Sequence, residues 1–280
     1  MQLKVKTPAK INLTLEIVNK REDGFHNIQS VMQLINLYDY LTFNVELSTK
    51  TEINLSGTSD EIPYNEKNLI YKATELFLSK TDIKGFKIDI YIEKNIPVSA
   101  GLAGGSTNAA GTIYGLNKIF NNPLTSAELH ELCASLGSDL NVCLEGGCLL
   151  AEGRGEIITK LPFRNSEVSL IKPLDLGISA KEAYTKYSQL ENKPNYDMTN
   201  KMIDSIKIGT DIKQFLYNDL ETAVFKDYKE LQKIKELYPQ SIMSGSGSTY
   251  FTLDNSIKEQ DGYWVKTNLK FISTGVETCE

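Results

Sequence analysis

Pro97-Val-Ser-Ala-Gly-Leu-Ala-Gly-Gly-Ser-Thr-Asn-Ala-Ala110 links a predicted strand, 86–92, to a predicted helix, 107–120. In the strand, apolar residues alternate with polar ones, whereas the helix carries apolar residues three and four positions apart. Glycines let the backbone take positive φ and approach an anion closely. The N–H groups and the dipole of a helix's first turn favour negative charge at that point. The stretch therefore predicts a phosphate-binding loop.

Two commoner phosphate loops are excluded at this position. A P-loop requires a lysine after its last glycine, but Ser106 follows Gly105, and the dinucleotide fingerprint GxGxxG is missing as well. Ser106 and Thr107 can supply hydroxyl donors or lie near Mg²⁺, and Lys94 can supply a cation. The alternative interpretation is a plain strand-to-helix turn with a serine or threonine N-cap, and the glycines alone leave both open.

Composition limits the class of protein. The chain has 280 residues, of which 41% are hydrophobic, so it can bury the core of one large domain or two moderate ones. It contains no apolar run of about 18 residues, as a membrane span would need, and residues 1–6 do not resemble a signal peptide. We therefore expect a cytoplasmic protein without a membrane partner. The net charge of -6 and the lack of a lysine run argue against nucleic-acid binding.

Four cysteines contain no CxxC pair, and the chain has two histidines. This spacing argues against a structural zinc site and predicts reduced, packed thiols. Cys279, close to the end of the chain, is expected to be exposed.

The remaining patterns predict an α+β protein with a domain boundary near residue 158. In the first part, strands are predicted at 1–17 and 146–152, a strand or strand pair at 31–45, and helices at 65–80 and 127–136. In the second part, a strand at 167–171 precedes a helix-rich region that reaches residue 238. The end is predicted as a glycine turn at 244–248 between strands at 242–243 and 249–253, then a helix at 257–269 and a strand at 271–274.

Three polar residues and one glycine turn outside the loop have two interpretations each. Lys10, inside an apolar strand, either faces solvent at an edge or points at a polar site. Asp139 either orients a substrate hydroxyl as a general base or caps a helix. His26, in the turn at 23–27, binds a ligand or is solvated, and the glycine turn at 243–249 either meets a phosphate or is a plain loop.

Together these segments resemble the three ordered motifs of the GHMP kinase superfamily. Residues 8–13 (Pro-Ala-Lys-Ile-Asn-Leu) resemble its first motif, 97–110 its ATP loop and 243–249 its third motif. The resemblance implies an α+β fold of two domains with the active site in the cleft between them. The N-terminal domain, 1–158, would be of the ribosomal protein S5 domain 2-like type, and the C-terminal domain, 159–280, ferredoxin-like.

Within the superfamily, the chain resembles most the kinases that act on 4-diphosphocytidyl-2-C-methyl-D-erythritol in the non-mevalonate isoprenoid pathway. The features are Arg-Glu-Asp-Gly-Phe-His at 21–26, Leu-Tyr-Asp-Tyr-Leu at 37–41, Asn-Leu-Ile-Tyr-Lys-Ala at 68–73, and Gly-Ser-Asp at 137–139 followed by Ala-Glu-Gly-Arg-Gly-Glu at 151–156. They imply transfer of the ATP γ-phosphoryl to the 2-hydroxyl of a cytidine diphosphate sugar alcohol by a monomer or homodimer. Another GHMP kinase and a non-catalytic nucleotide-binding paralogue are the alternatives.

The resemblance also implies the site residues. Catalysis would rest on Lys10 and Asp139, and Ser106 is a candidate ligand of Mg²⁺. The implied ATP-binding residues are Asn65, Lys94, Pro97, Val98, Ser99, Ala100, Gly101, Leu102, Ala103, Gly104, Gly105, Ser106, Thr107 and Asn108. The implied residues for the second substrate are Asn12, Phe25, His26, Tyr184, Gly245 and Ser246.

The sequence departs from the family pattern at several positions. Phe25 stands where a tyrosine is usual, so a stacking face remains but the phenol hydroxyl is lost. Asn141 replaces a common proline, and Ser99, Ala103 and Thr107 replace glycine, glycine and serine. We expect Ala103 to have a negative φ, because a methyl group disfavours the left-handed region.

Overall fold

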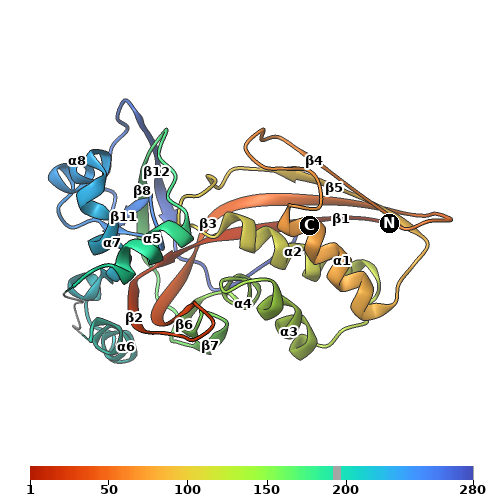
Figure 1. Ribbon diagram of the computed structural model, residues 1–280, viewed down its shortest axis with the longest axis horizontal. Coiled ribbons are helices and arrows are strands. Elements are labelled where there is room, and N and C mark those ends of the chain that lie inside the picture. The colour runs from red at the N-terminus through yellow and green to blue at the C-terminus, as the bar shows by residue number, and fades with distance from the viewer. Residues whose placement is uncertain (192–196, 280) are drawn as a thin grey trace.

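The computed structural model describes residues 1–191 and 197–279, which form two β-sheets and a set of helices (Figure 1). The chain is α+β, as predicted. In this part of the chain, no helix has the length and apolar character needed to cross a bilayer.

The larger sheet is organised around one strand, β3 (His26–Leu47). It pairs with β1 (Gln2–Asn12) along residues 32–44 and with β5 (Phe86–Glu93) along its last part, and its first part pairs with β2 (Thr14–Lys20) and β6 (Cys148–Gly153). The sheet is completed by β4 (Glu52–Gly57), β7 (Ile157–Lys160), β9 (Tyr217–Asn218) and β13 (Glu277–Thr278). Two of its strands, β9 and β13, therefore come from the C-terminal part of the sequence.

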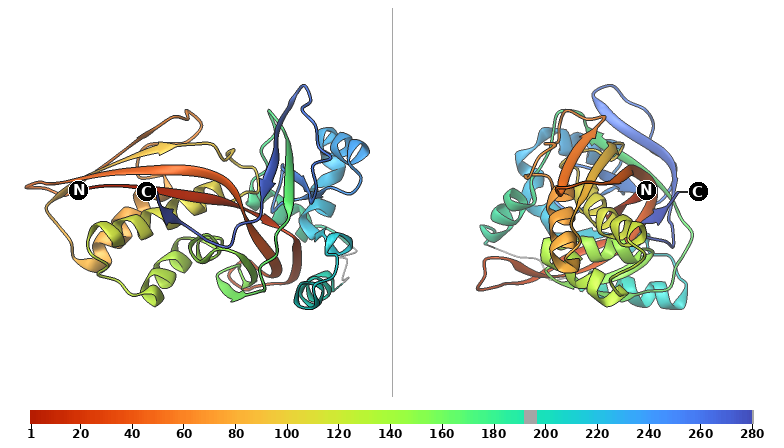
Figure 2. Two further views of the ribbon diagram at one scale, coloured as in Figure 1. Left: turned by 180° about the vertical axis from the view of Figure 1, so that it is seen from behind. Right: turned by 90° about the vertical axis from the view of Figure 1, so that its right-hand side faces the viewer.

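Helices α1 (Leu69–Thr81), α2 (Gly104–Ile119), α3 (Ser126–Leu136) and α4 (Leu140–Glu145) lie on one side of the long strands (Figures 1 and 2). Apolar residues of the sheet, such as Phe43 and Ile90, share a core with Phe77 of α1 and Ile113 of α2. The helix at 65–80 was predicted four residues too early, because Asn68 caps α1 by accepting from Ile70 N. Helix α2 begins three residues earlier than predicted.

The second sheet has the order β10-β11-β8-β12, and all its pairs are antiparallel. Its strands are β8 (Glu167–Pro173), β10 (Ile242–Met243), β11 (Tyr250–Thr252) and β12 (Tyr263–Lys270). Helices α5 (Ala180–Ser188), α6 (Met198–Ile208), α7 (Asp219–Val224) and α8 (Lys229–Leu237) accompany it, with 3-10 turns at Lys213–Phe215 and Phe225–Asp227.

The prediction of a helix at 257–269 was wrong. Residues 263–270 form β12, which pairs with β8 and adds an outer strand to the second sheet. Gly262, with φ of 82°, interrupts any helix, and the Tyr-Trp-Val run that follows favours a strand. The strand predicted at 271–274 is reduced to an isolated bridge between Phe271 and Ile35.

We expect native-state labelling to distinguish Cys279 from the other three thiols. Cys133, Cys143 and Cys148 are buried, and Cys279 is half-buried rather than exposed. Burial raises the pKa of Cys133 and Cys148 to about 12, and it raises that of Cys143 as well, so little reactive thiolate forms. At pH 8, iodoacetamide followed by peptide mass spectrometry should modify Cys279 first. Rapid native modification of Cys143 would contradict this expectation, and labelling in urea is the control.

Candidate active site

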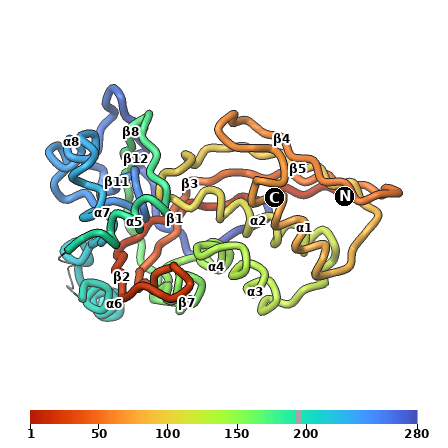
Figure 3. Tube along the Cα trace, in the orientation of Figure 1, coloured from red at the N-terminus to blue at the C-terminus, as the bar shows by residue number. Residues whose placement is uncertain are grey.

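A cavity of about 900 Å³ brings together segments that are far apart in the sequence. It is lined by residues of β1, the turn before β3, the glycine loop with the start of α2, the start of α4, helix α5 and the turn at 245–246. Figure 3 shows α5 beside the beginning of α2, where the two halves of the molecule meet. Its volume is typical of small-molecule sites.

Most of the site residues expected from the sequence line this cavity. These are Lys10, Asn12, Phe25, His26, Lys94, Pro97, Val98, Ser99, Ala100, Gly101, Ala103, Gly104, Gly105, Ser106, Asn108, Asp139, Tyr184, Gly245 and Ser246. Asn65, Leu102 and Thr107 are not among the lining residues. Asn65 is exposed ahead of α1, and the side chains of Leu102 and Thr107 are buried.

One end of the cavity is formed by the start of α2. The N-cap position is Ala103, and no side chain caps the helix, in contrast to α1 and α3. The expectation of a negative φ at Ala103 was wrong, because Ala103 has φ of 59° and Ser99 has φ of 51°. The backbone thus turns sharply into α2 and leaves the first N–H groups without a side-chain acceptor, which is the arrangement that binds anions.

The three motifs are joined by hydrogen bonds beneath the loop. Lys10 N donates to Leu102 O at 3.1 Å, and Ser244 Oγ donates to Gly101 O at 3.0 Å. Gly101 has φ of 75°, and a Cβ there would lie 1.9 Å from Ser244 O. Only glycine permits this approach. The turn at 243–249 is therefore packed against the loop, and it is more than a plain connection between strands.

Lys10 and Asp139 face each other inside the cavity. Lys10 Nζ lies 3.6 Å from Asp139 Oδ2 and donates to Asn12 Oδ1 at 2.7 Å, with 4% of the lysine side chain exposed. The lysine therefore points at a polar site and not at solvent. Asp139 occupies the N-cap position of α4, yet its carboxylate makes no capping hydrogen bond. The carboxylate remains free to accept a hydrogen bond from a bound molecule.

Lys94 lines the cavity, but its ammonium group is bound from below. It donates to Asp39 Oδ2 at 2.7 Å and to Ile96 O, and Asp39 is fully buried. Asp39 Oδ1 also accepts from Asn95 N at 2.6 Å and Ile96 N at 2.8 Å. Burial lowers the pKa of Lys94, although Asp39 opposes this shift. Lys94 thus joins the loop's entry strand to β3, a role the sequence did not suggest.

At the other end, the cavity is bordered by aromatic rings. The rings of His26 and Tyr184 are stacked with centroids 5.2 Å apart, and His26 Nε2 is hydrogen-bonded to Ser188 Oγ at 3.1 Å. His26 is 9% exposed, so it is not a solvated turn residue. Phe25 is 52% exposed, and Arg154 Cζ lies 5.2 Å from its ring centroid.

Sequence reasoning missed Arg154, Ser138 and Ser188, which also line the cavity. Arg154 and Ser138 stand inside segments that carry the family resemblance, so a signal existed, although no role followed from it. Ser188 lies four positions after Tyr184, the spacing that places two residues on one face of a helix. The sequence did not show that this face meets His26.

The chain is similar to known kinases over most of its length. Residues 68–147 match the family model described as GHMP kinases N terminal domain. A 4-diphosphocytidyl-2-C-methyl-D-erythritol kinase of Syntrophomonas wolfei is 41% identical over 87% of this chain and 86% of its own. The enzyme of that name from Clostridium botulinum strain Alaska E43 is 41% identical over 92% of this chain and 94% of its own.

Solved structures agree with these relatives. A crystal structure of 4-(cytidine 5'-diphospho)-2C-methyl-D-erythritol kinase has a TM-score of 0.72 and 28% identity, covering 91% of this chain and 90% of that one. A homoserine kinase from Cytophaga hutchinsonii has a TM-score of 0.75 at 16% identity, covering 99% and 97%, and thus shares the fold. From the sequence relatives, the chain belongs to the 4-diphosphocytidyl-2-C-methyl-D-erythritol kinase family of the GHMP kinases.

Proposed function

We propose that this chain phosphorylates the 2-hydroxyl of 4-diphosphocytidyl-2-C-methyl-D-erythritol with ATP. The observation that carries the proposal is the position of Asp139 and Lys10, 3.6 Å apart in one cavity that reaches from the uncapped start of α2 to Phe25 and His26. One end of this cavity suits a triphosphate and the other a nucleobase. The acceptor hydroxyl would lie between them, beside the carboxylate.

In the proposed reaction, the 2-hydroxyl oxygen attacks the γ-phosphorus of ATP. A new P–O bond forms, the bond between the γ-phosphorus and the β–γ bridging oxygen breaks, and its electron pair leaves with ADP. Asp139 accepts a hydrogen bond from the hydroxyl and takes its proton late, because a carboxylate is a weak base at neutral pH. Lys10 and the N–H groups at the start of α2 stabilise charge on the transferring group.

The loop residues would hold the triphosphate, with Asn108 and Lys94 close to the nucleotide. Mg²⁺ fits this site in the usual way, because it is commonly held by phosphates with few protein ligands. Among the described residues no group of three His, Cys, Asp or Glu could hold a metal. The hydroxyl of Ser106 and the carboxylate of Asp139 are oxygen donors that line the cavity. When bound, Mg²⁺ would neutralise phosphate charge.

The cytosine ring would be held at the other end of the cavity. Phe25 and Tyr184 offer stacking faces, and the hydrogen bond between His26 Nε2 and Ser188 Oγ sets the orientation of the His26 ring. Asn12, Gly245 and Ser246 would contact the sugar alcohol and its phosphates. The Asn12 side chain accepts from Lys10 Nζ and donates to Ser30 Oγ, which sets its orientation in the cavity lining.

The same proposal covers the location, the assembly state, the partners and the domains of the protein. We propose a cytoplasmic monomer or homodimer that has no nucleic-acid or membrane partner. The proposed domains are 1–158 and 159–280, and the boundary between them falls inside β7 (Ile157–Lys160). Because β9 and β13 pair with strands of the larger sheet, the two proposed domains would share this sheet.

The test is to follow ADP release with Mg-ATP against five acceptors: 4-diphosphocytidyl-2-C-methyl-D-erythritol, methylerythritol phosphate, mevalonate, homoserine and galactose. We expect turnover with the cytidyl compound alone. Turnover with another acceptor would be consistent with phosphotransferase activity but would refute the proposed base pocket. ATP binding without turnover of any acceptor would favour a regulatory paralogue.

We expect Phe25→Ala to raise the KM for the cytidyl substrate about tenfold or more, because stacking on an aromatic ring contributes about 1–3 kcal/mol per base. The KM for ATP should change less than twofold, since the loop lies at the other end of the cavity. Steady-state kinetics with each substrate varied in turn measures both values. Phe163→Ala is the matched control, because Phe163 is 40% exposed and is not one of the lining residues. Equal changes in both KM values would remove Phe25 from the pocket.

A further inference from the structure

Arg154 is the cation beside the exposed ring of Phe25. Its Cζ lies 5.2 Å from the ring centroid, within the range of a cation–π contact. Among the described residues, no aromatic pair includes Phe25, and the ring is in none of the core clusters. The Phe25 ring is half exposed, and the cation–π contact with Arg154 is the ring contact that the structure records for it.

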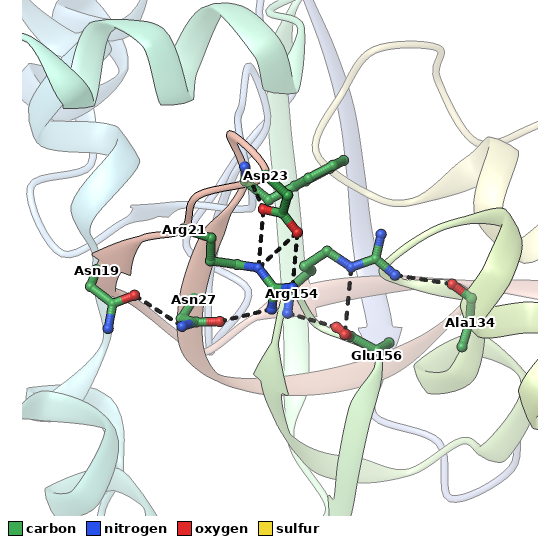
Figure 4. A network of polar contacts seen from close by, with 8 residues as sticks. Asn19, Arg21, Asp23, Asn27, Ala134, Arg154 and Glu156 are labelled. Carbon is green, nitrogen blue, oxygen red and sulfur yellow. Dashed lines mark hydrogen bonds and ion pairs between the residues drawn. The ribbon is translucent and has the colours of Figure 1, made fainter.

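The guanidinium of Arg154 is itself held in place (Figure 4). Nη2 donates to Ala134 O at 3.2 Å, near the end of α3, and Nε lies 3.5 Å from Glu156 Oε1. Arg154 N also donates to Glu156 Oε2 at 2.6 Å. Helix α3 and a carboxylate of the same turn thus contact the guanidinium, and 26% of the Arg154 side chain remains exposed.

The turn that carries Arg154 is also packed against the start of α4. A Cβ added at Gly155 would lie 3.3 Å from Ser138 Cβ and O, and Asn141 Nδ2 donates to Glu156 O at 2.9 Å. Asp139 stands between these two contacts in the sequence. The turn that carries Arg154 therefore contacts the residues on both sides of the proposed catalytic carboxylate.

The backbone of Phe25 is held by hydrogen bonds that do not involve its ring. Phe25 N donates to Asp23 Oδ1 at 3.1 Å, and Arg21 N donates to Phe25 O at 2.8 Å. Arg21 in turn holds Asp23 and Asn27 (Figure 4). These contacts define the turn but leave the ring free to rotate about its side-chain bonds. Phenylalanine also has no hydroxyl through which a hydrogen bond could fix it.

We infer that Arg154 is a positioning residue, which holds the Phe25 ring so that its free face can stack on the cytosine of the substrate. The guanidinium covers part of the ring and replaces the orientation that a hydroxyl would provide. This inference rests on the proposed cytidyl site at Phe25 and His26. Arg154 would thus contribute to substrate binding through the Phe25 ring, without contacting the phosphates.

Calorimetric titration of the whole protein with cytidine and with cytidine 5'-diphosphate tests the inference. We expect Arg154→Met to weaken binding of both compounds to a similar extent, about three- to tenfold, as loss of a partly exposed cation–π contact predicts. In kinetics, the KM for the cytidyl substrate should rise by this factor while kcat and the KM for ATP stay within about twofold. Arg154→Lys should show part of the loss, because it keeps the charge but not the planar group.

A double-mutant cycle with Phe25→Leu separates the two ways in which Arg154 can act. If Arg154 works through the ring, Arg154→Met should cause no further loss once the ring is gone. Additive losses would overturn the inference, because Arg154 would then act independently of the ring. A loss with cytidine 5'-diphosphate but not with cytidine would also overturn it and make Arg154 a phosphate ligand. Unchanged binding by Arg154→Met would overturn it too.

Arg164→Met is the matched control, because Arg164 also donates to carbonyl groups at the end of a helix but lies outside the cavity. The Arg164→Met variant should unfold at a lower temperature, because these hydrogen bonds are lost, while its cytidine binding stays unchanged. Failure of the wild-type protein to bind either compound would refute the proposed cytidyl site, and the inference with it. Normal wild-type binding that is unaffected in the Arg154 variants would refute only the inference.

Discussion

Asp139→Asn is expected to lower kcat by about 10²–10⁴-fold, the range in which positioned acid–base groups contribute. The amide keeps the size of the carboxylate but cannot accept the proton of the attacking hydroxyl. It also loses the negative charge that lies 3.6 Å from Lys10 Nζ. Single-turnover measurement of phosphoryl transfer with the cytidyl substrate would report the chemical step directly.

The same substitution should leave folding and ATP binding close to normal. Asp139 makes no capping hydrogen bond and 27% of its side chain is exposed, and Lys10 Nζ keeps Asn12 Oδ1 as an acceptor, so little stability is lost when the charge is removed. Thermal unfolding and titration with a fluorescent ATP analogue are the controls. Turnover near the wild-type rate would remove Asp139 from the mechanism. A collapse of stability would show that the carboxylate is structural.

Asp39→Asn is expected to destabilise the protein by about 3–5 kcal/mol, as breaking one half of a buried ion pair typically does. The carboxylate is fully buried and holds Lys94 Nζ at 2.7 Å, and 6% of the Lys94 side chain is exposed. Without Asp39, the ammonium group would stay buried with Ile96 O as its recorded acceptor. Urea unfolding followed by circular dichroism measures the free energy.

The loss should depend on pH in a defined direction. Burial already lowers the pKa of Lys94, and Asp39 is the main group that opposes this shift. Without Asp39, the folded-state pKa falls further below the unfolded value, so the folded state binds the proton less well. The stability lost in the variant is therefore largest below the folded-state pKa of Lys94. It shrinks as pH rises towards the unfolded-state pKa of that lysine. A deficit that grew between pH 7 and pH 10 would contradict this account.

Asp89→Asn provides the matched control for Asp39. Asp89 lies on β5 in the same sheet, pairs with Lys87 at 3.0 Å and accepts from Asn54 at 2.8 Å, and 34% of its side chain is exposed. Exposed pairs of this kind contribute about 0–1 kcal/mol. Similar losses for the two variants would show that burial of the Asp39–Lys94 pair is not the cause.

The sequence by itself determined the parts of the protein that depend on local chemistry. Alternation predicted β5, and helical spacing predicted α1 and α2, because side-chain periodicity follows directly from backbone geometry. The glycine loop and the order of the three motifs indicated the family. They also indicated Lys10 and Asp139, which line one cavity in the structure.

Only the tertiary structure decided features that depend on distant partners. Lys94 is hydrogen-bonded to Asp39, which is 55 positions away in the sequence, and His26 to Ser188, which is 162 positions away. Residues 263–270 become a strand because the edge of β8 is available to pair with them. The left-handed φ of Ala103 is held by the packed loop around it, against the preference of its methyl group. In each case, long-range pairing and packing outweigh the local preference that a sequence pattern reports.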